Sequence, residues 1–299
     1  MNKKTKLHIE DVYKSYGEKV VLDNIDLTVS EGEFCTMVGP SGCGKSTLLK
    51  LILGQEIQSE GRIHIDGYPV SFPSPERGIV FQKYSLFPNL TVLENVLIGK
   101  RFKKGNWWNP FSKNNQDHDE AMMYLEKVRL TDAVSKYPHE LSGGMQQRAA
   151  IAQSLIMKPP VLLMDEPFGA LDPDTREDLQ LFILELWEKE NLTIFFVTHD
   201  LEEACFLGSR LLVLSQYYTD DRGQYSNCRG GKIVADYPLP HMASATTVKN
   251  EPEFKEFISN IRQEGFDPEF LQHVRQFNLQ HSDKFQTLTE QEFNGARNL

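Results

Sequence analysis

Residues 39–46 read Gly-Pro-Ser-Gly-Cys-Gly-Lys-Ser, which fits the pattern GxxxxGK[ST]. The loop lies between an apolar stretch, GEFCTMVG, and a helical pattern, STLLKLILG. In this order of strand, loop and helix, the backbone N–H groups of the loop and the positive end of the helix are expected to face a polyphosphate. An ordinary glycine-rich turn is the alternative, and the position between a strand and a helix argues against it. The sequence therefore predicts an α/β core that binds a nucleotide.

Two residues of this loop have expected roles in nucleotide chemistry. Lys45 is expected to reach the β- and γ-phosphates of ATP, and the Ser46 hydroxyl is expected to bind Mg²⁺. The pattern leaves position 43 free, so Cys43 is expected to act as a spacer. The nucleotide-binding residues expected in the loop and the start of its helix are Gly39, Pro40, Ser41, Gly42, Cys43, Gly44, Lys45, Ser46 and Thr47.

The rest of the chain alternates between strand and helix patterns. Leu7–Val12 and Asn24–Val29 alternate apolar and polar residues, and Asp66-Gly67 is a hairpin signal, so the N-terminal part is expected to be antiparallel β. The apolar stretches VLLMDE and LTIFFVTHD alternate with amphipathic helices, which is typical of a parallel α/β core.

Composition limits the classes of function. A length of 299 residues is more than one core usually needs, and we expect a main domain at 1–243 with an extension at 244–299. The net charge of −10 argues against a nucleic-acid partner. The four cysteines form no metal or disulfide pattern and fit a reduced cytoplasm. No apolar run approaches the roughly 20 residues of a membrane span, so any membrane role is expected to need a partner.

Two acids follow the apolar strand VLLM. The strand is expected to end at the carboxyl edge of the sheet, where ligand sites of α/β proteins lie. Asp165 is expected to hold Mg²⁺, and Glu166 to polarise the attacking water. On their own, two acids that end a strand before Pro167 would be equally well explained as a strand terminus. Downstream of a phosphate loop, the catalytic interpretation is favoured.

Leu141-Ser142-Gly143-Gly144 lies upstream of these acids, with a hydroxyl and two glycines at the start of a helix. Such a helix start is suited to a second anion, although it has no lysine. Taken alone, the segment would be interpreted as a helix start capped by the Ser142 hydroxyl. In this order and spacing, LSGGMQQR resembles the signature motif of the ABC ATPases. The resemblance covers about residues 7–240 and implies a P-loop fold of ABC type, with an N-terminal antiparallel β part and a helical subdomain at about 84–158. The C-terminal tail lies outside the resemblance and is expected to be helical from its own apolar spacing.

The resemblance also implies roles for further residues. Tyr16 matches the aromatic residue that stacks on adenine, and Gln82 matches the Q-loop glutamine that contacts Mg²⁺ and water and senses the permease. Asp172 matches the D-loop, and His199 matches the switch histidine at the γ-phosphate. Taken singly, each has an ordinary structural explanation, and only their joint order favours these roles.

The resemblance also implies a shared ATP site, further partners and a location. Each ATP would lie between one subunit's phosphate loop and the Ser142-Gly143-Gly144 segment of a second copy, or of a homologous ATPase subunit. The expected further partners are an integral membrane permease and, through it, a periplasmic or lipid-anchored solute-binding protein. The chain is expected at the cytoplasmic face of the inner membrane as a peripheral subunit.

Within that family, the chain is most similar to ATPases of nitrate-, sulfonate- and taurine-type importers. The stretches PERGIVFQ, LFPNLTVLENV and MDEPFGALDPDTRE carry this similarity, and GNWWNPF points to a subgroup associated with urea breakdown. The expected cargo is a small anionic or nitrogen- or sulfur-containing solute. Two alternatives stay open: the motor subunit of an exporter, which shares every catalytic residue, and a non-transport ABC ATPase. Against the second alternative, the sequence lacks the long coiled coil of DNA-repair members and the second cassette of translation factors.

Two segments depart from the family pattern. The insert at 101–116 combines basic residues with Trp107 and Trp108 and is expected either to contact the permease or lipid headgroups, or to be a surface loop. The tail from about 244 is expected to be a regulatory extension or an amphipathic helical pair, with Phe254, Phe257, Ile258 and Ile261 on one face.

Overall fold

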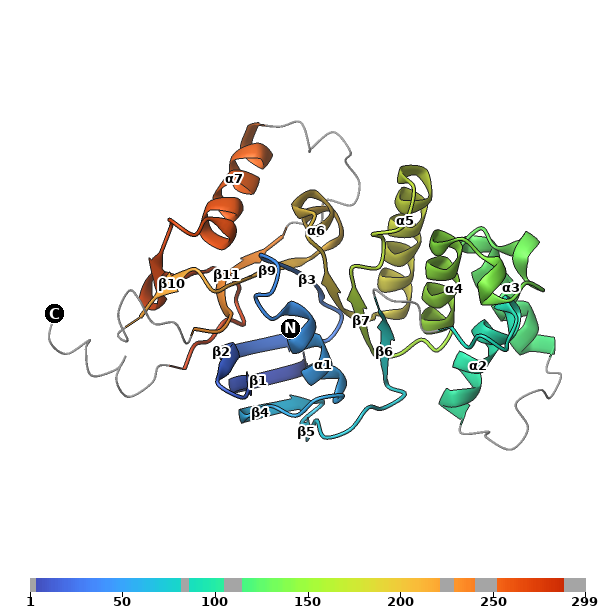
Figure 1. Ribbon diagram of the computed structural model, residues 1–299, viewed down its shortest axis with the longest axis horizontal. Coiled ribbons are helices and arrows are strands. Elements are labelled where there is room, and N and C mark those ends of the chain that lie inside the picture. The colour runs from blue at the N-terminus through green and yellow to red at the C-terminus, as the bar shows by residue number, and fades with distance from the viewer. Residues whose placement is uncertain (1–3, 82–85, 105–114, 221–228, 240–251, 288–299) are drawn as a thin grey trace, which may run out of the picture. The chain divides into compact units, whose positions relative to one another are not determined.

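The computed structural model describes residues 4–81, 86–104, 115–220, 229–239 and 252–287 (Figure 1). The chain divides into two compact units, Met1–Phe72 with Phe195–Leu299, and Pro73–Ile194.

The N-terminal part of the first unit is an antiparallel sheet with strand order β2-β1-β4-β5. Its strands are β1 (Thr5–Tyr16), β2 (Lys19–Ser30), β4 (Glu60–Ile65) and β5 (Tyr68–Pro69). Asp66 and Gly67 join β4 to β5 with φ of 51° and 82°. Two consecutive positive φ values are what a type I′ hairpin turn requires, so the predicted hairpin is confirmed.

A second sheet of this unit has the strand order β13-β11-β9-β3-β8. The boundary between the two units falls within β8. The strands are β3 (Phe34–Val38), β8 (Thr193–Val197), β9 (Arg210–Ser215), β11 (Lys232–Pro238) and β13 (Asn278–Leu279). β3 and β9 are parallel and entirely buried, as their apolar runs predict. β11 pairs with β9 antiparallel.

The described residues of the first unit form three α-helices, α1 (Lys45–Leu53), α6 (Leu201–Leu207) and α7 (Pro252–Phe266). α6 packs against β3, and α7 packs against β9 and β11 (Figure 1). The phosphate loop joins β3 to α1, so the strand, loop and helix order predicted from the sequence is confirmed.

The second unit pairs two parallel strands with a group of helices. Its elements are β6 (Arg77–Val80), α2 (Val92–Lys104), α3 (Asn115–Lys127), the short turns η1 (Thr131–Ala133) and η2 (Pro138–Glu140), α4 (Gly143–Leu155), β7 (Val161–Asp165) and α5 (Pro173–Glu190). α2 packs on α3 and α4, which agrees with the helical subdomain expected there. Trp107 and Trp108 of the insert, and Gln82, lie outside the described residues.

Within residues 252–287, the described part of the tail, there is one helix where a helical pair was expected. α7 buries Ile258 and Ile261 against the core of the first unit, and Phe254 and Phe257 pack beside them, so the predicted apolar face is confirmed. After Phe266 the chain reads Asp-Pro, and proline cannot continue a helix. The described segment from 267 to 287 has no further α-helix. It contains β12 (Gln272–His273), which pairs with β10 (Tyr218–Thr219), the short 3-10 turn η4 (Val274–Gln276), and β13.

Among the described residues, no helix combines the length and the hydrophobicity needed to cross a bilayer. This agrees with the short apolar runs seen in the sequence.

Candidate functional site

The phosphate loop is built on close approaches that only glycine allows. A Cβ on Gly39 would lie 2.0 Å from the Leu214 carbonyl oxygen at the end of β9. At Gly44 the φ is 106°, and a Cβ would lie 2.6 Å from the Leu22 side chain of β2. Larger residues at either position would push the loop away from the two strands that support it. The glycines thus fix the loop in the curved shape that a polyphosphate needs.

Lys45 directs its ammonium group into this loop. Its Nζ donates hydrogen bonds to the carbonyl oxygens of Gly39 (2.6 Å) and Pro40 (3.0 Å), and the residue is buried. The first turn of α1 begins at the same residue, so a fixed cation and the positive end of a helix lie together. This arrangement attracts polyphosphate groups and fits the role expected for Lys45.

Cys43 is buried within the loop, with its Sγ 3.9 Å from the Lys45 Nζ. Burial raises the pKa of the thiol, although the Lys45 charge acts in the opposite direction. A buried, protonated thiol is a poor nucleophile. The spacer role expected for Cys43 is therefore consistent with its surroundings, and slow alkylation is expected.

Two further residues of the predicted site belong to the first unit. Tyr16 ends β1 with an exposed ring, and its hydroxyl donates a hydrogen bond to the Glu56 carboxylate. His199 is exposed and follows β8, and Asp200 beside it caps α6 by accepting from the N–H groups of Glu202 and Glu203. The candidate nucleotide-binding residues that the first unit holds are thus Tyr16, the phosphate loop and His199.

The second unit holds the remaining described candidates, at the starts of two helices and at the end of β7. The Ser142 hydroxyl accepts from the Met145 N–H at 3.3 Å and caps α4, which confirms the cap predicted there. Asp172 caps α5 by accepting from the Thr175 N–H at 3.0 Å, and this hydrogen bond lowers the pKa of the carboxyl group. Gly143 and Gly144 form the first turn of α4, so the Ser142-Gly143-Gly144 segment is a helix N-terminus, as expected.

Asp165 ends β7, and Glu166 follows it with a φ of 48°. A left-handed backbone at a glutamate is uncommon and costs free energy, so neighbouring contacts must maintain it. Gln147 of α4 supplies such contacts. Its Nε2 donates to the Glu166 carbonyl oxygen (3.3 Å), and its Oε1 accepts from the Ala170 N–H (3.2 Å).

Gln147 was not assigned a role from the sequence, where it is one of two glutamines after the signature segment. Its side chain is 2% exposed and joins the signature helix to both ends of the turn that contains Glu166. It is therefore placed to fix the backbone of the candidate catalytic carboxylate.

Replacing Gln147 by leucine is expected to lower the ATPase turnover about tenfold, because small misplacements of a reacting group are costly. Substrate affinity is expected to stay within about twofold, since Gln147 holds only the turn that carries Glu166. Steady-state phosphate release measures the first quantity and calorimetric titration the second. Gln153→Leu is the control: Gln153 lies on the same helix and bonds the Asn95 carbonyl oxygen instead. Equal turnover losses in both variants would contradict this role.

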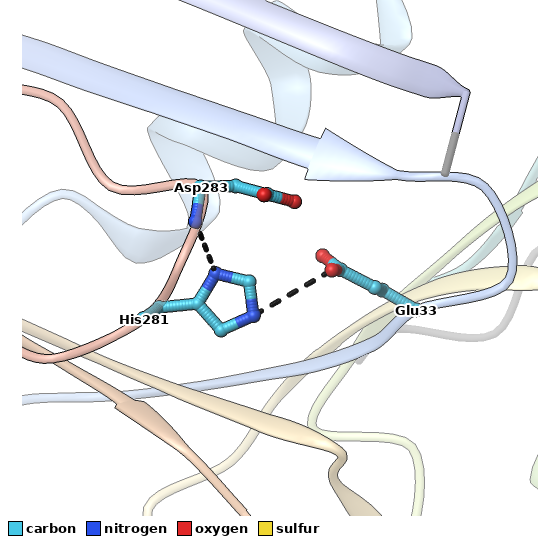
Figure 2. Close-up of side chains that lie close together, drawn as sticks. All are labelled: Glu33, His281 and Asp283. Atoms are coloured by element: carbon cyan, nitrogen blue, oxygen red, sulfur yellow. Dashed lines mark hydrogen bonds and ion pairs between the residues drawn. The ribbon is translucent and has the colours of Figure 1, made fainter. Parts of the chain in front are cut away.

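A largely buried cluster outside these segments joins the tail to the N-terminal sheet of the first unit. Glu33, His281 and Asp283 place potential ligand atoms within 4.8 Å of one another (Figure 2). The ring geometry does not suit a metal ion, however. His281 Nδ1 accepts from the Asp283 N–H at 3.2 Å, so the ring proton lies on Nε2, which faces Glu33 at 3.6 Å. A metal-binding histidine instead donates from its second nitrogen.

Instead, this cluster helps to attach residues 278–287, here called the tail strap, to the N-terminal sheet. The Ser30 hydroxyl donates to Asp283 at 2.7 Å, and the Thr287 N–H donates to Asp26 at 2.6 Å. The Phe285 ring stacks on His8 at 5.1 Å. The strap therefore spans the N-terminal sheet and is part of the folded first unit.

The contribution of His281 to the stability of the fold is expected to decrease below neutral pH. Burial and the nearby Arg210 charge lower the pKa of His281, against the opposing effect of Glu33, Asp236 and Asp283. A base whose pKa is lowered by folding stabilises the fold above its unfolded pKa of about 6.5, and that stability is lost as the pH falls.

The check is thermal unfolding of the natural protein and of the His281→Gln variant between pH 7.5 and pH 5.5. The natural protein should lose more stability on acidification than the variant, because glutamine carries no titrating group. Identical pH dependence in the two proteins would show that His281 does not contribute.

The fold and the phosphate loop together define an α/β protein of the P-loop nucleotide-binding class. Comparison with known proteins specifies the class further. Residues 22–169 match the family model of the ABC transporter. The chain is 45% identical over 266 residues to an aliphatic sulfonates import ATP-binding protein of Bacillus subtilis, covering 89% of this chain and 95% of the relative.

Two further comparisons agree. A nitrate import ATP-binding protein of Synechocystis is 41% identical over 252 residues, covering 82% of this chain and 88% of the relative. The structure is similar to a dimeric ATP-binding cassette bound to ADP and phosphate, with a TM-score of 0.65, 30% identity, and coverage of 78% of this chain and 99% of that one. The chain belongs to the ABC transporter family and is an ATP-binding, ATP-hydrolysing subunit.

Proposed function

We propose that this chain energises import of a small anionic, or nitrogen- or sulfur-containing, solute through a separate membrane permease. The observation that carries the proposal is the complete phosphate loop with Lys45 directed into it, in a chain whose relatives are import ATP-binding proteins for sulfonates and nitrate. The chain would act at the cytoplasmic face of the membrane, with a periplasmic or lipid-anchored solute-binding protein delivering the solute.

The hydrolytic site is proposed to be shared between two copies. Each ATP would contact Lys45 of one copy and the Ser142-Gly143-Gly144 helix N-terminus of the other, because both segments are suited to anions. Similarity to a dimeric cassette with ADP and phosphate supports this arrangement. An isolated subunit would then carry two half-sites.

Within that site, Glu166 is proposed to accept the proton of the attacking water and His199 to contact the γ-phosphate. Tyr16 would stack on adenine, and Asp172 would act at the contact between copies. The Ser46 hydroxyl and the Asp165 carboxylate, with Gln82, offer the hard oxygen atoms that Mg²⁺ prefers. Mg²⁺ would neutralise phosphate charge.

ATPase activity reconstituted with the cognate permease and solute-binding protein tests the proposal. Nitrate, sulfonates, bicarbonate, urea and amino compounds should be screened singly. An importer predicts stimulation only when the permease, the binding protein and one matching solute are all present. Stimulation by solute and permease without any binding protein would favour the exporter alternative.

A further inference from the structure

Tyr16 is held by contacts that reach the far end of the phosphate-loop helix. Its hydroxyl donates a hydrogen bond to the carboxylate of Glu56, which follows the C-terminus of α1. The Glu56 N–H in turn donates to the Lys50 carbonyl oxygen of that helix at 3.4 Å. The exposed aromatic ring at the end of β1 is thus tied to the element that starts at Lys45.

Lys14 covers one face of the same ring. Its Nζ lies 4.8 Å from the ring centroid, a distance typical of a cation–π contact. The ammonium group is fixed there by the Ile57 carbonyl oxygen at 2.8 Å and by Glu56 at 3.5 Å, and the Lys14 side chain is only 13% exposed. With one face of the ring under Lys14, a planar ligand can stack only on the other.

The charges around Tyr16 and Glu56 determine which of the two donates the hydrogen bond between them. The hydrogen bond from Tyr16 lowers the pKa of Glu56, and the charges of Lys50 and Lys14 act in the same sense, so the carboxylate stays ionised. Burial and the Glu56 contact raise the pKa of Tyr16, so the phenol keeps its proton. Tyr16 therefore donates and Glu56 accepts at neutral pH.

We propose that Glu56 and Lys14 are positioning residues, which hold the Tyr16 ring with one open face at a fixed place beside the phosphate loop, ready to stack on the adenine of ATP. The inference rests on the proposed function, since it assumes that Tyr16 is the stacking residue. A ring that is already ordered loses little entropy on binding, so more of the stacking free energy appears as affinity. Neither Glu56 nor Lys14 is expected to contact the phosphates of ATP.

The test uses the full-length protein and calorimetric titration with Mg²⁺-ATP and, separately, with Mg²⁺-tripolyphosphate, which has no base. Glu56→Ala and Lys14→Met should each raise the Kd for ATP about three- to tenfold, the range that one aromatic stack contributes. The Kd for tripolyphosphate should not change. Glu56→Gln keeps an acceptor for the Tyr16 hydroxyl and should restore most of the affinity for ATP.

Glu10→Ala is the matched control, because Glu10 is an acid of the same strand whose ion-pair partner is Arg62. It should leave both affinities unchanged. In a Tyr16→Ala background, Glu56→Ala should cause no further loss, since its effect acts through the ring. Thermal unfolding of each variant verifies that it is folded, and Lys14→Met provides an independent test if Glu56→Ala does not fold.

The possible failures are distinguishable. Equal losses for ATP and tripolyphosphate in Glu56→Ala, or an undiminished loss in the Tyr16→Ala background, would overturn the positioning role and leave the proposed function standing. If Tyr16→Ala itself bound ATP normally, the stacking assignment would be wrong. If Lys45→Ala bound both ligands normally, the phosphate-loop site would be wrong as well.

Discussion

Replacing Glu166 by glutamine is expected to lower the ATPase rate by at least about 100-fold, the effect typical of losing a general base. The substitution keeps the size of the side chain and removes only its ability to accept a proton. ATP affinity should stay within about twofold, because the phosphate loop and Lys45 are untouched. With hydrolysis blocked, ATP should hold two copies together as a stable dimer.

Phosphate release, ATP titration and sedimentation in the presence of ATP measure these three properties. Glu177→Gln is the control, since Glu177 is an exposed acid of α5 in the same unit and carries no expected role. It should behave like the natural protein. Near-normal turnover in Glu166→Gln would show that another group accepts the proton.

Replacing Arg210 by methionine is expected to cost about 3–5 kcal/mol of the free energy of unfolding. The Arg210 side chain is fully buried at the start of β9. Two of its nitrogens donate to Asp236 at 2.8 and 2.7 Å, and a third lies 3.2 Å from Glu33. Methionine would leave two buried carboxylates without their cation, and the tail strap at Glu33 would be weakened with them.

Chemical denaturation of both proteins at pH 7.5 measures this loss. Arg62→Met is the control: its ion pair with Glu10 is exposed, and such pairs contribute less than about 1 kcal/mol. If the two variants lost the same stability, the buried network would not be a main support of the first unit.

Local patterns were enough to predict much of this protein. The glycine spacing of the phosphate loop, the Asp66-Gly67 turn and the Ser142 cap depend on residues a few positions apart, and the structure has each of them. The buried strands could also be predicted, because strands of a parallel sheet are buried on both faces and therefore form continuous apolar runs in the sequence.

The missed features depend on partners that are distant in sequence. Arg210 reads as a polar residue at a strand end, and only the fold brings it to Glu33, which is 177 positions away in the chain. Lys14 and Glu56 are likewise ordinary charged residues until the fold brings β1 next to the segment that follows α1. No periodicity or motif marks such pairs.

The tail shows the same limit. The apolar face of α7 was predictable from its helical spacing, whereas the strap at 278–287 has no period of its own. It takes its shape from hydrogen bonds to Ser30 and Asp26 and from pairing with β11. An extended segment of this kind is specified by the surface that it covers.

Solute uptake into proteoliposomes tests the central claim most directly. The vesicles would contain the cognate permease with this chain and ATP inside, and the solute-binding protein with labelled solute outside. Uptake should require internal ATP and should be lost in Glu166→Gln. ATP-dependent loss of solute from preloaded vesicles, or uptake that continues at full rate in Glu166→Gln, would contradict an ATP-driven importer.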